Sequence, residues 1–558
     1  MNGNMQDPKT ICQRWSKMTG DRAPWDGIWQ EVSDYAVPRK VPQRVANNTT
    51  GIGSNAANRL YDVTAIEAVS ILASGHSSAI TPAGTQWFAW EAPDSIKSDE
   101  ADAWYNDCSE KARNLLAQSN FHTMLNEAFE DRAGFGICCL GAMPSATRTI
   151  TFQAHPVGCF CLEEDVDGDV DTVFMRRPYS IRQLVQQFGE EVVGKNTVLG
   201  KAWEDWKSKG YDSDHSVIHA VFPRLERDSS KMDALNMAFA SCWVAEEGQS
   251  MLLESGFEEL PFCVSRYLKH SGSRQQYGYS PFEQVRAAVI GANRTKQILQ
   301  VVGQKLAVPP ILVPDNLVGN VDTRPGGKTI FKASSGVLPK EWLSGGNPQG
   351  MAEELEDDRK SIRDAYHTDL FRMFVDREKQ MTAREVSELA AEKLMPFSPS
   401  FTRFTADFQV MMDRIFSIMF RAGVFGEVNA SPQAVIVQRG DFREVPPPKV
   451  VYQSRVALAI RQAETAAADR LVERAMGLAQ MNPGALDNID MDAYLRTSAR
   501  NDGVVEKMLR PEKEMQAQRD QRAQAEAQAQ QLAQAQQAAD AAGKVGVKVP
   551  PGMMGGSQ

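Results

Sequence analysis

Residues 281–308 carry the most regular pattern of apolar and polar positions in the chain, and its period is that of a helix. Apolar residues recur there at steps of three, four or seven, so they form one stripe along the helix. The stripe consists of Phe282, Val285, Val289, Ala292, Leu299, Val302 and Leu306. Ser280 and Glu283 are spaced as a capping box at the start, and Pro309 stops the pattern. We therefore predict a helix about 40 Å long.

The next segment, residues 309–350, is too rich in proline and glycine to be helical, and it contains short runs with strand composition. We predict a small knob of strands and turns. The helical pattern resumes at 351–370, where carboxylates fill the first turns and favour a helix N-terminus. After a break at 371–381, a capping box at Thr382 and Glu385 starts another helix. Two rods ending in an exposed knob gain little from each other alone, so we expect the apolar stripe to pack between rods of the same or neighbouring copies.

The flanking regions mix helical and strand patterns. Residues 1–276 contain helical stretches rich in tryptophan and several runs of strand alternation. In one run Asp167 and Gly168 lie between alternating valines, which favours a hairpin turn. A calcium loop is the alternative, but the glycine comes two residues too early for an EF-hand. Residues 382–455 contain a long helix with a stripe of Phe and Met, which is typical of a core. The predicted fold class is α+β, mainly helical.

Composition is that of a folded protein, with 558 residues, 42% of them hydrophobic and 24% charged. The net charge of -10 argues against a protein whose main task is to grip nucleic acid, because that affinity comes from Lys and Arg. It is compatible with DNA passing nearby. We find no apolar run of the ~18 residues that span a bilayer and no signal peptide, so we expect synthesis in the cytoplasm and no membrane partner. Eight cysteines without metal or redox spacing are expected to be reduced packing residues.

Candidate chemistry is weak throughout. The run at 324–329 approaches a phosphate-binding loop, but Asp322 stands where the motif needs its first glycine. His215 and His219 are four residues apart, yet the residues between them have strand character and no third ligand is near. The run at 75–79 lacks the second glycine of a nucleophile elbow. The sequence therefore predicts no catalytic residue, no metal site and no cofactor, and indicates a structural protein.

The C-terminal part changes in composition. Residues 456–511 carry helical pieces separated by Pro-Gly and Asp-Gly turns. Residues 512–542 are almost entirely Ala, Gln and charged residues, which favour helix but supply little apolar area. We expect this helix to become ordered only when it is bundled with copies of itself.

The order of these elements resembles that of portal proteins, the head-to-tail connectors of short-tailed phages. In that family a phrase like Tyr-Gly-Tyr-Ser-Pro at 277–281 leads into the first stem helix. A phrase like Thr-Ala-Arg-Glu-Val at 382–386 follows the channel loop. The phrases Arg-Leu-Tyr-Asp at 59–62 and Ile-Thr-Pro at 80–82 are similar to the start of the family's chains.

The resemblance implies a portal fold with wing, stem, clip and crown, assembled into a ring with an axial channel. It divides the chain into an N-terminal wing (1–276), a first stem helix (277–308), a clip (309–350), a second stem helix (351–370), a channel loop (371–381), long helices that complete the wing (382–455), a helical crown (456–511) and an Ala/Gln-rich C-terminal helix and tail (512–558).

The resemblance also implies the function and the partners. Twelve copies would form the ring at one capsid vertex of a virion, where DNA is packaged by the terminase motor and later ejected, and where the tail attaches. The implied partners are further copies of the chain, double-stranded DNA in the channel, the terminase motor, the major capsid and scaffolding proteins, and tail adaptor proteins.

The implied site residues fall into two sets. The DNA-facing residues of the channel loop are Arg372, Asp376, Arg377, Glu378 and Lys379. The residues of stem packing are Phe282, Val285, Val289, Leu299, Val302 and Leu306. Another ring-forming virion component, such as a tail adaptor, is the alternative. A DNA-packaging ATPase is disfavoured because the phosphate-binding loop is missing.

Overall fold

The chain forms two compact units, residues 1–463 and residues 464–558. The structure is a computed structural model, and it describes residues 5–40, 60–145, 147–228, 231, 233–270, 276–307, 311–312, 340–341, 348–373, 398–426, 431–439, 442–453, 468–478, 489–501 and 512–544. Helices and strands are mixed in the larger unit, so the predicted α+β class is confirmed.

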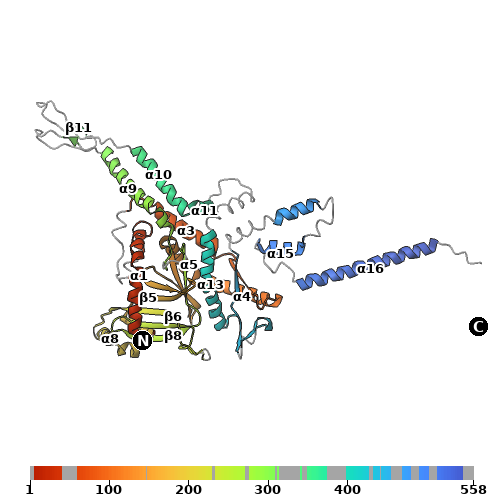
Figure 1. Ribbon diagram of the computed structural model, residues 1–558, viewed down its shortest axis with the longest axis horizontal. Coiled ribbons are helices and arrows are strands. Elements are labelled where there is room, and N and C mark those ends of the chain that lie inside the picture. The colour runs from red at the N-terminus through yellow and green to blue at the C-terminus, as the bar shows by residue number, and fades with distance from the viewer. Residues whose placement is uncertain are drawn as a thin grey trace, which may run out of the picture. The chain divides into compact units, whose positions relative to one another are not determined.

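A five-stranded antiparallel sheet in the order β4-β5-β6-β7-β8 forms one part of the larger unit (Figure 1). Its strands are β4 (Phe160–Glu164), β5 (Val170–Ser180), β6 (Asp214–Pro223), β7 (Phe239–Ala245) and β8 (Ser250–Phe257). Successive side chains of a strand point to opposite faces, so Ile218, Ala220 and Phe222 of β6 share one face. Helix α1 (Pro8–Tyr35) covers that face with Ile11 and Trp15.

The other side of the sheet packs against two groups of residues. Val217 of β6 and Leu252 of β8 contact three short helices. These helices are α6 (Ile181–Phe188), α7 (Glu190–Lys195) and α8 (Thr197–Lys209). Val173 and Val221 join the main core of the unit instead. The sheet is therefore buried on both faces.

The main core contains side chains of a three-stranded sheet and of four helices of the body, together with side chains of α1 and of the helices that follow β9. The sheet has the order β3-β2-β9, from β2 (Ile137–Ser145), β3 (Thr149–His155) and β9 (Phe262–Arg266). The four helices of the body are α3 (Thr64–Ile80), α4 (Asp99–Gln118), α5 (Phe121–Phe135) and α13 (Ser398–Arg421). The predicted Phe/Met stripe of α13 is buried, as expected of core residues. Two strands that are far apart in the sequence, β1 (Phe88–Glu91) and β14 (Lys449–Tyr452), pair with each other in this part of the chain.

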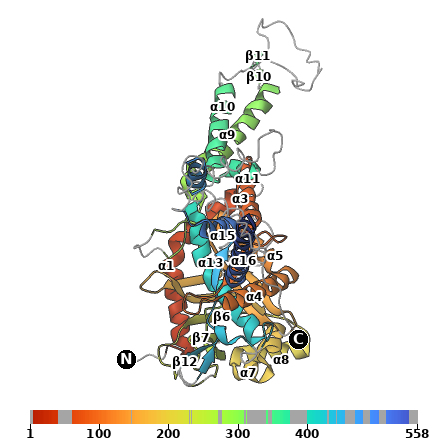
Figure 2. The ribbon, with the colours of Figure 1, turned by 90° about the vertical axis from the view of Figure 1, so that its right-hand side faces the viewer.

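Two long helices project side by side from this body in both views (Figures 1 and 2). They are α9 (Pro281–Ala307) and α10 (Pro348–Ala365), and we call them the α9–α10 hairpin. Between them a two-residue ladder joins β10 (Ile311–Leu312) to β11 (Lys340–Glu341). A short helix, α11 (Thr368–Met373), follows α10. The predicted helix start at Pro281 is confirmed.

The smaller unit contains a helical stretch at 468–478 together with α15 (Met491–Asn501) and α16 (Glu512–Lys544). Tyr494 of α15 donates a hydrogen bond of 2.7 Å to Asp469, and Arg519 of α16 pairs with Asp492. The described side chains of α16, residues 515–533, are nearly all exposed.

A small 3-10 turn (Gln433–Val435) and the pair β12 (Val437–Arg439) and β13 (Phe442–Glu444) belong to the larger unit.

Several local predictions are confirmed. Residues 165–169 form the turn between β4 and β5, with Gly168 at a φ of 88° that favours glycine. His215 and His219 lie on strand β6, where a spacing of four residues separates them by about 13 Å. All eight cysteines are free and buried. The second capping box at Thr382 and most of the predicted knob lie outside the described residues.

Candidate functional site

The point where α9 leaves the body is built on two glycines. Gly136 follows α5 at a φ of 77°, and a Cβ there would lie 2.5 Å from the backbone nitrogen of Ser280. A Cβ on Gly278 would lie 2.4 Å from the carbonyl oxygen of Gly136. Real Cβ atoms do not approach backbone this closely, so only glycine fits at either position. The Tyr-Gly-Tyr phrase thus lets two backbone segments touch at the root of the hairpin.

The tyrosines on either side of Gly278 are held by aromatic rings of α1. Tyr279 lies 4.8 Å from Trp25, and Tyr277 lies 5.3 Å from Trp29 in an edge-on arrangement, between ring centroids. Such pairs contribute about 0.5–1.5 kcal/mol each beyond the area they bury. The N-terminal helix therefore fixes the direction in which α9 starts.

The predicted cap at the start of α9 forms with one difference. The Glu283 carboxylate accepts a hydrogen bond of 2.8 Å from the backbone nitrogen of Ser280, as expected. The Ser280 hydroxyl accepts from the nitrogen of Phe282, at 3.1 Å, rather than from that of Glu283. Burial raises the pKa of Glu283 despite these hydrogen bonds. Val285 departs from helical geometry, so α9 is kinked one turn after this cap.

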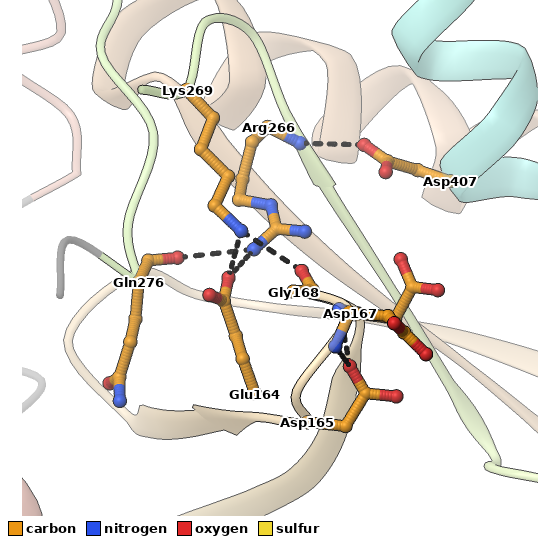
Figure 3. Close-up of polar contacts among 9 residues, drawn as sticks. Glu164, Asp165, Asp167, Gly168, Arg266, Lys269, Gln276 and Asp407 are labelled. Atoms are coloured by element: carbon orange, nitrogen blue, oxygen red, sulfur yellow. Dashed lines mark hydrogen bonds and ion pairs between the residues drawn. The ribbon is translucent and has the colours of Figure 1, made fainter. Parts of the chain in front are cut away.

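Charged residues close the root of the hairpin on another side (Figure 3). Arg266 at the end of β9 forms an ion pair with Glu164, and its Nη1 also donates to the carbonyl oxygen of Gln276, at 3.4 Å. Lys269 donates to the same carboxylate of Glu164 at 2.6 Å. The backbone nitrogen of Arg266 donates to Asp407 of α13, at 3.1 Å. Arg266 thus connects the acidic turn, the lead into α9, and α13.

Arg132 is a second buried cation of this region. It is fully buried, and it donates to the carbonyl oxygen of Ser400 at 2.9 Å and to the hydroxyl of Ser265 at 3.2 Å. Its guanidinium lies over the rings of Tyr267 and Phe404. Burial lowers the pKa of Arg132. The residue joins α5, β9 and the first turn of α13.

Further from the body along the hairpin, the extended segment that contains Tyr61 and Asp62 binds both helices. The side-chain oxygen of Asn293, on α9, accepts from the backbone nitrogens of Tyr61 and Asp62, at 2.7 and 3.2 Å. Arg359, on α10, donates through Nε and Nη2 to one oxygen of Asp62, at 2.9 and 2.7 Å. The other oxygen of Asp62 accepts from the nitrogen of Thr64. We call Tyr61, Asp62, Asn293 and Arg359 the brace.

The predicted stripe of α9 is divided by the structure. Phe282 and Val289 are buried in the main core, and Val285 and Leu299 are partly buried against it. Val302 is half-buried and Leu306 is 57% exposed. The lower half of the stripe therefore packs inside one chain, whereas its upper end is uncovered in a single copy.

The predicted channel loop begins too early. Phe371, Arg372 and Met373 are the last residues of α11, so the break in helical structure does not start at 371. Phe371 is buried, and its ring fills the space that a Cβ on Gly75 would need. Among the described residues, the helix is interrupted earlier, at His367, whose φ of 51° separates α10 from α11. The remaining predicted loop residues, Asp376, Arg377, Glu378 and Lys379, lie outside the described residues.

Among the described residues, no three His, Cys, Asp or Glu side chains are grouped so that they could hold a metal ion. In that same part of the chain, no helix is long and apolar enough to cross a membrane.

Comparison with known proteins decides the family. A sequence model of the bacteriophage head to tail connecting protein family matches residues 8–509. The chain belongs to this family. The connector is also 26% identical over 522 residues to the portal protein of Salmonella phage epsilon15, covering 91% of this chain and 90% of that one. It is 27% identical over 518 residues to a probable portal protein of Bordetella phage BPP-1, covering 90% and 89%.

These relatives confirm the resemblance to portal proteins of short-tailed phages, so the connector is a structural head-to-tail component. The matched range includes the whole α9–α10 hairpin and all four residues of the brace. Sequence reasoning noted the Arg-Leu-Tyr-Asp phrase but assigned the brace no role, because its partners lie more than 200 residues away.

Proposed function

We propose that this connector forms a ring, of twelve copies as the family resemblance implies, at one capsid vertex, and that DNA passes through its axial channel. The observation that best supports a ring is the upper half of α9. Ile298, Val301 and Leu306 are 41%, 43% and 57% exposed there in a single copy. Three large apolar side chains on a projecting helix favour burial against further copies.

The parts of the ring are proposed from the position of each segment in the chain. The α9–α10 hairpin is the stem, and the residues between its helices are the clip, which offers a docking surface to the terminase motor and then to tail adaptor proteins. The body before and after the hairpin is the wing. The helices after residue 456 form the crown, and α16 lies beyond it. Major capsid and scaffolding proteins are the proposed partners of the wing.

The channel loop follows α11 in this proposal and carries its charges in alternation. Arg377 and Lys379 would come near the DNA phosphates, while Asp376 and Glu378 offset their charge. Weak, alternating contacts let DNA slide, whereas a strongly basic wall holds it by counterion release. Changing Arg377 and Lys379 together to Ser is expected to give intact rings that package or retain DNA poorly. Normal packaging and retention would end the channel-loop proposal.

No catalytic role is proposed, because the family is structural and the candidate chemistry of the sequence is weak. The second candidate, a tail adaptor, is disfavoured because the family match covers a body and a hairpin together. The two candidates differ in where the protein lies in the virion. A phage whose connector carries a C-terminal epitope tag is expected to bind antibody at a single capsid vertex after the tail is removed. Label that leaves with the tail would support the adaptor.

A further inference from the structure

The two helices of the hairpin carry opposite charge. Helix α9 contains four cations and one carboxylate, whereas α10 contains six carboxylates and three cations. The single carboxylate of α9, Glu283, is used in its cap. The exposed part of α9 is therefore basic and that of α10 is acidic.

These charges are not paired with one another inside the chain. In the described part of the chain, Arg294 of α9 has no ion-pair partner, and neither do Glu353 and Asp357 of α10. All three are exposed. Burial, followed by the like charges of Glu354 and Asp357, raises the pKa of Asp358. Neighbouring carboxylates of α10 thus repel one another within one copy.

Each charged side lies on a defined helical face. Arg294, Ile298, Val301 and Lys305 follow one another at steps of four, three and four, which places them on one exposed stripe of α9. Glu353 and Asp357 are four residues apart on the face of α10 opposite the buried Leu355. One stripe is basic with two apolar residues at its centre, and the other is acidic.

We propose that, in the ring, the basic stripe of α9 in one copy packs against the acidic face of α10 in the next copy. The occupant of each face is thus a second copy of this chain. This inference rests on the proposed ring, and it names the contact that closes the ring. Because the two faces differ, the contact is head-to-tail, the type that generates a ring when the rotation between copies closes.

The positions of the charged residues along the hairpin fit this pairing. In one hairpin, Asp358 lies 3.0 Å from the position of a Cβ on Gly291, which sets the level of α10 beside α9. Arg294 lies about one helical turn further from the body than Gly291. It is therefore level with the turn of α10 from Glu353 to Asp357. Rotation about an axis along the hairpin leaves each residue at its own level. Arg294 of one copy therefore meets these carboxylates on its neighbour, while Ile298 and Val301 exclude water beside them.

The test uses two charge-reversed variants of the full chain. Arg294→Glu puts a carboxylate opposite the acidic face of α10, and Glu353→Arg with Asp357→Arg puts two cations opposite Arg294. At about 0.1 M salt, each variant alone is expected to lose the ring peak in sizing chromatography and to migrate as a folded monomer. A 1:1 mixture is expected to recover the ring, because acidic and basic copies can alternate. Unmodified rings should dissociate more readily at about 1 M salt, where the Debye length falls to about 3 Å.

Arg182→Glu, an exposed cation on α6, is the matched control and is expected to leave rings intact. Arg294→Gln, which removes charge without adding any, should weaken the ring and replaces the reversed variant if circular dichroism shows that one unfolded. The inference is overturned if the reversed variants assemble normally, as they would if the acidic face of α10 lined the channel, or if their mixture stays monomeric. Monomers of the unmodified chain would instead contradict the proposed ring itself.

Discussion

The brace allows a quantitative prediction about the hairpin. Asp62 is nearly buried, with 4% of its side chain exposed, and Arg359 supplies its only cation among the described residues. Replacing Arg359 by Ala removes two charge-assisted hydrogen bonds and leaves the carboxylate without that cation. Asp62 would keep its hydrogen bonds with Thr64, including the one from the Thr64 backbone nitrogen.

The expected cost follows from burial. Breaking one side of a buried ion pair costs about 3–5 kcal/mol, and an exposed pair is worth about 0–1 kcal/mol. Arg359 is 21% exposed, between these cases. We therefore expect Arg359→Ala to lower the free energy of unfolding by about 2–3 kcal/mol.

Glu356 provides the matched control. It forms the other ion pair of Arg359, at 2.5 Å, but is itself 59% exposed. Glu356→Ala should lower the free energy of unfolding by at most about 1 kcal/mol. Both variants can be compared by guanidinium denaturation followed by circular dichroism, with identical assembly states. Equal costs for the two variants would refute the brace.

The pH dependence gives a second check of the same contact. Burial acts to raise the pKa of Asp62, but hydrogen bonds from Thr64 and Arg359 outweigh it, so the net pKa lies below its ordinary value. A lowered folded-state pKa stabilises the protein above the unfolded-state value of about 3.9 and loses that contribution as pH falls through the folded-state value. The difference between the native chain and Arg359→Ala should therefore be constant near neutral pH and shrink below about pH 4. If the native chain and Arg359→Ala still differ by the same free energy of unfolding at that low pH, this account is contradicted.

Three further predictions concern other parts of the chain. Gly136→Ala should destabilise the chain by about 1–3 kcal/mol more than Gly210→Ala, because both glycines have positive φ but only Gly136 is crowded by backbone; equal denaturation midpoints would count against the close approach. Val289→Asp should cost more than about 3 kcal/mol and leave little folded protein, whereas Leu306→Asp should fold normally and impair only assembly; normal folding of the first would contradict the packing of α9. Truncation after Arg510 should still permit rings, since the Ala/Gln helix buries little apolar area; monomers would show that it is an assembly element.

Local patterns of the sequence predicted local structure well. The start of α9, the turn at Gly168 and the core stripe of α13 each depend on residues within a few positions of one another. The hydrogen bond from the backbone nitrogen of Ser280 to the Glu283 carboxylate was predicted for the same reason. Capping and hydrophobic periodicity act at short range, so a single sequence reveals them.

What the sequence did not reveal depends on distant pairing. The periodicity of α9 joins Val289 and Leu306 in one stripe, but only the fold determines that the first faces the body and the second does not. The sequence placed Phe371 in a loop, whereas it lies in α11 with its ring over Gly75, a residue almost 300 positions away. The brace joins residues 62 and 359, which no local signal connects. Such contacts need the tertiary structure.

The central claim is that copies of this connector assemble around an axial channel. An averaged end-on view of the purified full-length protein by electron microscopy tests it most directly. The account predicts a closed ring, twelvefold by family resemblance, with a hole along its axis. Monomers, or closed particles without an axial hole, would contradict it.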